Sequence, residues 1–365
     1  MSELPYQIAL TLLPQIGDVQ ARLLLQHLGS ASAIFREKKS HLEKIEGIGA
    51  VRAASIKSFR DFSLAESEAA FVEKFRIEPL FFTDSNYPAR LLHCYDAPVL
   101  LYYKGSANLN ASRIAAIVGT RTATSYGRQS TEQLVEALAA EEVIIVSGLA
   151  LGIDAAAHRA ALQWGAPTVG VVGHGLDQVY PYTHKALARD MIAKGGGLLT
   201  EFTSGTKPDR HHFPLRNRIV AALSDVTIVM ETSIKGGSMI TAKMADAYNR
   251  DVFALPGRTT DSKSSGCNYL IQHNKAMLLS DADALLQVMG WKKEQHQAKK
   301  QRALFPELTA DEQKLMALLQ EGNPVPIDEL NLRSGLSASS VAAALLNLEL
   351  QGIVKTMPGK QYGLV

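Results

Sequence analysis

The chain has 365 residues, of which 46% are hydrophobic and 20% charged, with a formal net charge of +2 and a pI of about 8.4. These values exclude a disordered chain, allow more than one domain, and exclude polyanion binding through overall charge alone, so such binding would need local patches. With only two cysteines and no apolar run of about 20 residues, a disulfide framework and a membrane span are also excluded, and we expect a cytoplasmic protein without membrane contact.

Residues 1–75 predict a domain of short helices, because leucines recur at helical spacing and strand signals are few. The segment IEGIG at 45–49 fits the hairpin of a helix-hairpin-helix unit, whose backbone N–H groups can hold a DNA phosphate. LPQIG at 13–17 is an imperfect copy, with Gln15 where a glycine is expected. Two interpretations stay open for this zone: a DNA contact, or plain turns between helices.

Residues 76–290 predict a doubly wound α/β fold with a parallel, Rossmann-like sheet. Apolar, β-branched runs alternate with helical patterns, and most runs are continuous, which is typical of strands buried on both faces. The expected strands are 99–103, 113–118, 143–147, 168–172, 198–202, 226–230 and 251–255, and the expected helices are 126–140, 153–164, 183–194, 216–223 and 238–249.

The last part of the chain predicts a tether and a small domain. Residues 291–304 are polar and carry several lysines, which indicates a basic linker. Residues 305–365 read as three helices and a hairpin that turns at Pro358-Gly359, the pattern of a winged helix. Thr309 and Glu312 form a capping-box pattern at the first helix. The third helix has no Arg or Lys, which argues against strong reading of a major groove.

In a doubly wound sheet, ligands bind at the carboxyl ends of the strands, so the loop after each strand is a candidate site. The loop 119–127 contains Gly119, which lets a ligand approach the backbone, and Arg121, which can pair with a phosphate through two hydrogen bonds. Ser125 either caps the following helix or binds the anion. The spacing matches neither a dinucleotide fingerprint nor a Walker A loop, so neither ligand is specifically indicated.

Other loops on the same expected edge have a similar character. Small residues follow the strand 143–147, and a Gly-rich segment with Lys235 precedes the helix 238–249, so both offer backbone N–H groups to an anion. His158 has no identifiable partner and is interpreted as structural. The candidate anion-binding residues in these two loops are Ser147, Gly148, Gly237 and Ser238.

The stretch HHFPLRNR at 211–218 supplies most of the expected charge. Arg216 and Asn217 are placed in the phosphate site, together with the nearby Lys207. Arg218 is assigned to the same site, with pairing to an internal acid, Glu201 or Glu231, as the alternative. Phe213 is either a platform on which a base stacks or a core phenylalanine that anchors the turn before Pro214.

These motifs together resemble the DNA-processing protein A family, also called DprA or Smf. The resemblance covers about residues 95–285 and rests on the blocks GTRTATSYG, SGLALGIDAAAH, HFPLRNRIVAALS, GGSMITAKMA, and VFALPG with SGCNYLI. It implies an extended Rossmann core between a SAM-like helical domain and a winged helix. The family's phosphate-pocket roles would fall on Gly119, Arg121, Ser125, Ser147, Gly148, Phe213, Arg216, Asn217, Arg218, Gly237 and Ser238, while Lys207 lies in a more variable loop.

The resemblance also implies a function. Such a protein would bind single-stranded DNA, protect it, and load the recombinase RecA onto it during natural transformation. It would form a homodimer through the core, for which we expect the segment 264–275, and would need no cofactor, metal or catalysis. The alternative is a Rossmann-like enzyme on nucleotide phosphates, of the phosphoribohydrolase type, but the corresponding helix start, GGSMITAKMA, lacks the glutamate that such an enzyme requires.

Overall fold

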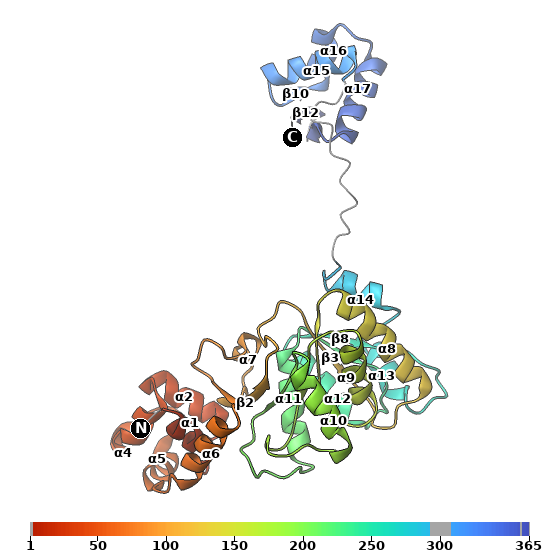
Figure 1. Cartoon of the computed structure of the whole chain (residues 1–365). Coiled ribbons are helices and arrows are strands. Elements are labelled where there is room, and N and C mark those ends of the chain that lie inside the picture. The colour runs from red at the N-terminus through yellow and green to blue at the C-terminus, as the bar shows by residue number, and fades with distance from the viewer. Residues whose placement is uncertain (1–2, 293–307, 358–359, 365) are drawn as a thin grey trace. The chain divides into compact units, whose positions relative to one another are not determined.

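The computed structural model of the chain (Figure 1) describes residues 3–292, 308–357 and 360–364. The described residues form two compact units, 3–292 and 308–364. Most of the expected linker, residues 293–304, and the expected turn at Pro358-Gly359 lie outside the described residues. Trp291, the first residue assigned to the linker, is instead buried among apolar side chains of the first unit, so the packed structure extends further than the composition indicates.

A nine-stranded sheet, in the order β1-β2-β6-β5-β4-β3-β7-β8-β9, is the centre of the first unit. All seven expected strands are present. The strands β1 and β2 depart from the parallel pattern, because β1 pairs antiparallel with β2 and β2 pairs antiparallel with β6. The structure adds β1 and β9 at the two edges of the sheet: β9 has only two residues, and β1 begins with Glu78 and Pro79, which are unfavourable in strands. The bounds are β1 Glu78–Phe81, β2 Leu100–Gly105, β3 Ile114–Val118, β4 Ile144–Ser147, β5 Thr168–Val171, β6 Gly197–Thr200, β7 Val226–Val229, β8 Asp251–Ala254 and β9 Met277–Leu278.

Helices cover both faces of this sheet. Along β3, Ala115 and Ile117 face one apolar cluster, and Ile114, Ala116 and Val118 face the other, as the two-residue period of a strand requires. The expectation of strands buried on both faces is therefore confirmed. One face carries α8 (Ser125–Ala140), α9 (Ile153–Gln163) and α14 (Ala282–Val288), and the other carries α7 (Ala89–Leu92), α11 (His212–Leu223), α12 (Gly237–Ala247) and α13 (Ser265–Gln272). The remaining elements of the core are η1 (Tyr182–His184) and α10 (Lys185–Ala193).

Six short helices precede the sheet, as expected, and share an apolar cluster with β1 and β2. Polar contacts join them to the core: the Asp18 carboxylate accepts from the Val99 N–H at 3.0 Å. Gln15 has φ = 66°, so it adopts the backbone conformation for which a glycine was expected. The helices are α1 Leu4–Thr11, α2 Asp18–Leu28, α3 Ala31–Arg36, α4 Lys39–Leu42, α5 Gly49–Ser58 and α6 Ser63–Lys74.

The second unit has the winged-helix pattern. Three helices pack beside a three-stranded sheet in the order β10-β12-β11. The capping box is confirmed, since the Thr309 N–H donates to the Glu312 carboxylate at 2.8 Å and the Glu312 N–H to the Thr309 hydroxyl at 3.3 Å. Its elements are α15 Ala310–Glu321, β10 Val325–Pro326, α16 Ile327–Ser334, α17 Ala338–Leu350, β11 Val354–Met357 and β12 Gln361–Leu364. In neither unit do the described residues include a helix long and apolar enough to cross a membrane.

Candidate functional site

A cleft of about 540 Å³ lies where the loops after β3, β4 and β7 meet the start of α11. In the sheet, β3 is flanked by β4 and β7, and the chain runs outward in opposite directions from this point, which is where doubly wound folds bind ligands. We call it the anion cleft. Its polar and aromatic lining consists of Thr120, Arg121, Asp154, Arg210, Phe213, Arg216, Asn217, Thr232, Ser233, Ser238 and Thr241, with Gly119, Gly236 and Gly237.

The helix α11 carries the arginines, and it begins four residues earlier than expected, at His212 rather than at residue 216. Pro214 therefore lies inside the first turn and does not precede the helix. A proline is accepted there because the N–H groups of the first turn have no acceptor within the helix. As a consequence Arg216 and Asn217 belong to the second turn, and they reach the cleft with their side chains.

Arg216 is the most deeply set cation of the cleft. Its side chain is buried, with 6% of the residue exposed, and its Nε has no hydrogen-bond partner among the described residues. Burial lowers the pKa of Arg216 to about 10; the negative charge of Asp154 acts against this shift, and the positive charge of Arg121 adds to it. The guanidinium stays cationic at neutral pH, and a buried cation with an unused N–H donor favours an anionic ligand.

Gly148 and Asp154 lie around the Arg216 side chain and determine its position. A Cβ on Gly148 would lie 1.3 Å from the Arg216 Nη1 atom, so only a glycine leaves room for the guanidinium. The buried Asp154 carboxylate accepts from the backbone N–H groups of Gly148 at 3.2 Å and of Ala150 at 3.4 Å. Gly148 therefore acts by making space behind the cleft rather than by lining it. Ser147 lies further inside, where its buried hydroxyl donates to the Ile117 carbonyl at 2.6 Å.

Arg121 and Phe213 stand together at the mouth of the cleft. The Arg121 guanidinium lies over the Phe213 ring, 5.1 Å from its centroid, and the Arg121 side chain is exposed. Phe213 is half-buried and belongs to none of the apolar clusters formed by the described residues. The Phe213 ring therefore lies at the surface of the cleft, and the alternative that Phe213 is a core residue is wrong.

The start of α12 forms the opposite wall. A Cβ on Gly237 would meet no atom within 4 Å, so the backbone is open to the cleft at this point. The buried Ser238 hydroxyl has no partner among the described residues. The first N–H groups of a helix are free donors, and the helix dipole adds partial positive charge beside them. Together with Arg216, this wall provides the donors that a phosphate or carboxylate group needs.

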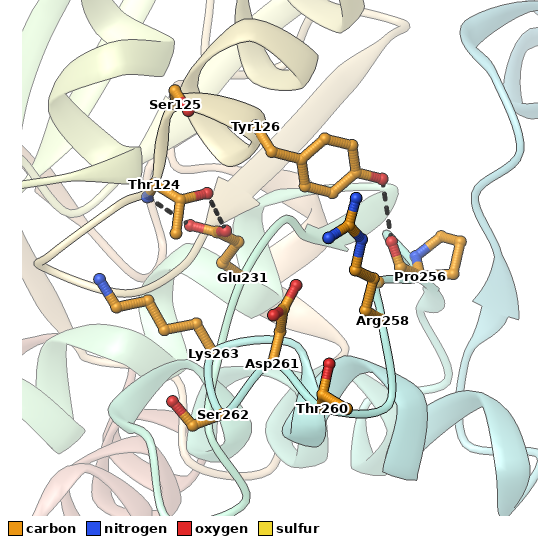
Figure 2. Close-up of a pocket in the computed structure, with 11 residues that line it drawn as sticks. Thr124, Ser125, Tyr126, Glu231, Pro256, Arg258, Thr260, Asp261, Ser262 and Lys263 are labelled. Carbon is orange, nitrogen blue, oxygen red and sulfur yellow. Dashed lines mark hydrogen bonds between the residues drawn. The ribbon is translucent and has the colours of Figure 1, made fainter.

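Ser125 lies elsewhere, in a second cavity of about 930 Å³ that Figure 2 shows. Thr124 rather than Ser125 caps α8, because the Thr124 hydroxyl accepts from the Gly127 N–H at 3.1 Å. The Thr124 N–H and hydroxyl both donate to the Glu231 carboxylate, whereas the Ser125 side chain points away from it. Sequence reasoning placed the cap one residue too late, although Thr124 is an equally good capping residue.

Arg218 also lies outside the anion cleft. Its buried guanidinium donates to the carboxylates of Glu201 and Asp18, the latter at 3.2 Å, and to the Asp96 carbonyl. Of the two interpretations of Arg218, the structure therefore favours pairing with an internal acid, and that acid is Glu201. Burial raises the pKa of Glu201 to about 7, and Arg218 opposes that shift. We therefore leave Arg218 out of the candidate site.

The cation that the loop before α11 contributes to the cleft is Arg210 and not Lys207. Lys207 is exposed and, like Lys235, does not line the cleft. Arg210, which lies three residues after Lys207, does line it. The sequence indicated that this loop is basic, but a loop has no periodicity that could show which side chain turns inward. Thr232 and Ser233 are lining residues that sequence reasoning did not select, although they lie just before the Gly-rich segment that it did select.

Comparisons with known proteins show to which family the chain is similar. Residues 78–290 match the family model of DNA recombination-mediator protein A, and residues 298–360 match that of the DprA winged helix domain. The Smf protein of Synechocystis sp. is 33% identical over 398 residues, which cover 99% of this chain and 98% of the relative.

Two solved structures are also similar. The crystal structure of DNA processing protein A from Streptococcus pneumoniae has a TM-score of 0.66 and 34% identity, covering 79% of this chain and 98% of the other. The structure of DNA processing protein A from Helicobacter pylori, which describes that protein's single-stranded DNA binding mode, has a TM-score of 0.53 and 33% identity, covering 59% and 96%.

Proposed function

The chain belongs to the DNA recombination-mediator protein A family, and on this premise we propose that it binds single-stranded DNA in the anion cleft. The observation that carries the proposal is Arg216, a buried cation with an unused N–H donor beside the open start of α12. A phosphate in this position would satisfy the Arg216 Nε and the buried Ser238 hydroxyl together. The likeness to the Helicobacter pylori protein, whose structure concerns single-stranded DNA, supports the choice of ligand.

The aromatic side of the cleft favours a single strand over a duplex. Binding of single strands combines cations along the backbone with aromatic rings on which bases stack. In a duplex the bases are paired and stacked inside the helix, so Phe213 would have no free base to contact. Arg216 is set so deep that a phosphate must enter the cleft to reach it, which a flexible strand allows more readily than a stiff duplex.

We further propose that binding protects the strand and that the protein then transfers it to RecA, without catalysis. Family membership supports this proposal. The proposed dimer surface remains the segment 264–275, which contains α13. Met277 and Leu278 follow this segment in the chain and are exposed apolar side chains, which a second chain would cover together with it.

The test of DNA binding is a pair of arginine variants, Arg121→Ala and Arg210→Ala, chosen because both side chains are exposed and their loss should not disturb folding. Anisotropy titrations with oligo-dT at several salt concentrations measure the affinity and its salt dependence. Each lost phosphate contact should weaken binding and reduce the salt slope by about 0.7. Wild-type affinity in both variants would refute the cleft as the DNA site.

Oligomeric state and chemistry are measured on the same material. Light scattering of the full chain should give the mass of a dimer, and Leu278→Lys should shift it to a monomer because it places a charge at the proposed interface. RecA filament formation on single strands should be faster with the protein than without it. Release of a free base from a nucleoside monophosphate would overturn the proposal of a non-catalytic protein.

A further inference from the structure

A third planar group continues the pair formed by Arg121 and Phe213. Tyr180 comes from the loop after β5, and its ring lies beside that of Phe213, with 6.1 Å between centroids and 31° between planes. Since the Arg121 guanidinium lies 5.1 Å from the Phe213 centroid, Phe213 has both Arg121 and Tyr180 as neighbours, and we call the three groups together the aromatic row. Three segments that are far apart in sequence contribute one member each.

Tyr180 is the more open ring of this row. Its side chain is 47% exposed, whereas Phe213 is half-buried and already has two planar neighbours. Tyr180 belongs to none of the apolar clusters of the described residues. The cationic character continues past it, because the Lys185 Nζ lies 5.6 Å from the centroid of the exposed Tyr182 ring.

The backbone that carries Tyr180 is fixed although its ring is not packed. The Tyr180 N–H donates to Nε2 of the buried His174 at 3.2 Å. Nδ1 of His174 lies 2.9 Å from the Gly175 carbonyl, which can only accept, so the ring proton is on Nδ1 and Nε2 is free to accept. The Thr200 hydroxyl of β6 donates to the His174 carbonyl at 2.9 Å. The loop is thus tied to the sheet, which fixes the backbone from which the exposed ring extends.

We propose that Tyr180 is a second base-stacking platform, which receives the base of the nucleotide next to the one that stacks on Phe213. The proposal rests on the proposed function and adds to it a contact to the base rather than to the phosphate. A ring contact of this kind tolerates any base, because every base has a flat face. The site therefore recognises consecutive unpaired nucleotides and not isolated phosphate groups.

The test compares Tyr180→Ala and Tyr180→Phe on two ligands, oligo-dT and an abasic sugar–phosphate oligomer of equal length. Tyr180→Ala should weaken oligo-dT binding about five- to tenfold and leave the abasic oligomer unaffected, because only the base is lost from the contact. Tyr180→Phe keeps the ring and should bind like wild type. A 2-aminopurine base in the oligomer should be quenched on binding to wild type and less so on binding to Tyr180→Ala.

Tyr95→Ala is the matched control. Tyr95 is 70% exposed and lies beside another ring, that of Tyr248, with 6.0 Å between centroids, but Tyr248, unlike Phe213, does not line the anion cleft. Its loss should change neither affinity. Equal weakening of both ligands by Tyr180→Ala, or oligo-dT affinity within about twofold of wild type, would overturn the inference while leaving the proposed function intact. Failure of the wild-type protein to bind oligo-dT would instead overturn the proposed function itself.

Discussion

Replacing Gly148 with alanine tests the position of Arg216 without changing any charge. The new Cβ would lie 1.3 Å from Nη1 and 2.4 Å from Cζ of Arg216. Since an ordinary contact needs about 3.4 Å, Nη1 must move by about 2 Å. A hydrogen bond does not survive a displacement of that size. A bond between charged groups is worth about 1.5–3 kcal/mol, so we expect oligo-dT affinity to fall about 10- to 100-fold.

The assay is a double-variant cycle. Oligo-dT affinity is measured for Gly148→Ala, for Arg216→Ala and for the two combined, with circular dichroism melts to show that each variant folds. If Gly148→Ala acts only by displacing Arg216, the combined variant should bind no worse than Arg216→Ala alone. It should also be more stable than Gly148→Ala, because removal of the guanidinium relieves the collision.

Two results would refute this reasoning. Wild-type affinity in a folded Gly148→Ala variant would show that the guanidinium is not needed where the structure places it. Additive losses in the combined variant would show that Gly148 acts on DNA by another route, such as direct backbone contact. In the first case Arg216 would no longer carry the proposal of a phosphate site, and in the second Gly148 would have a role independent of Arg216.

Three further predictions concern stability and domains. Arg218→Ala removes the cation that opposes the burial-driven rise of the Glu201 pKa, so this pKa should rise above its wild-type value of about 7. The variant should lose about 3–5 kcal/mol of unfolding free energy at a pH high enough to ionise Glu201, and less at neutral pH, where the unpaired carboxyl group keeps its proton. Urea unfolding at two pH values measures this, and oligo-dT affinity should not change. Burial lowers the pKa of His158 from 6.5 to about 3, so between these pH values only the unfolded chain binds the proton. The unfolding free energy should therefore fall by a few kcal/mol as the pH falls through this window, and it should fall by less in His158→Gln, which has no group that titrates there. Removing residues 308–365 should leave most of the single-strand affinity, since α17 carries no Arg or Lys; a collapse of affinity would assign the DNA contact to the winged helix.

Much of the fold follows from local patterns. Apolar runs of five or six residues predicted the seven inner strands, because a strand covered by helices on both faces carries apolar side chains on both faces. The strand β9 was missed because it has only two residues, and β1 was missed because it begins with Glu78 and Pro79, which are unfavourable in strands. The loops at the carboxyl ends of the strands could also be predicted as a site, because in a parallel sheet the direction of the strands determines which loops meet at one edge.

The assignment within the site depended on packing. Arg216 and Arg218 are two residues apart on α11, and about 100° of rotation per residue turns them to different sides of the helix. The sequence determined that one arginine faces away from the other, but only the packing of α11 on the sheet decided that Arg216 faces the cleft and Arg218 faces Glu201. The meeting of Tyr180 with Phe213 was likewise decided by tertiary structure, because loops have no period from which the direction of a side chain could be read.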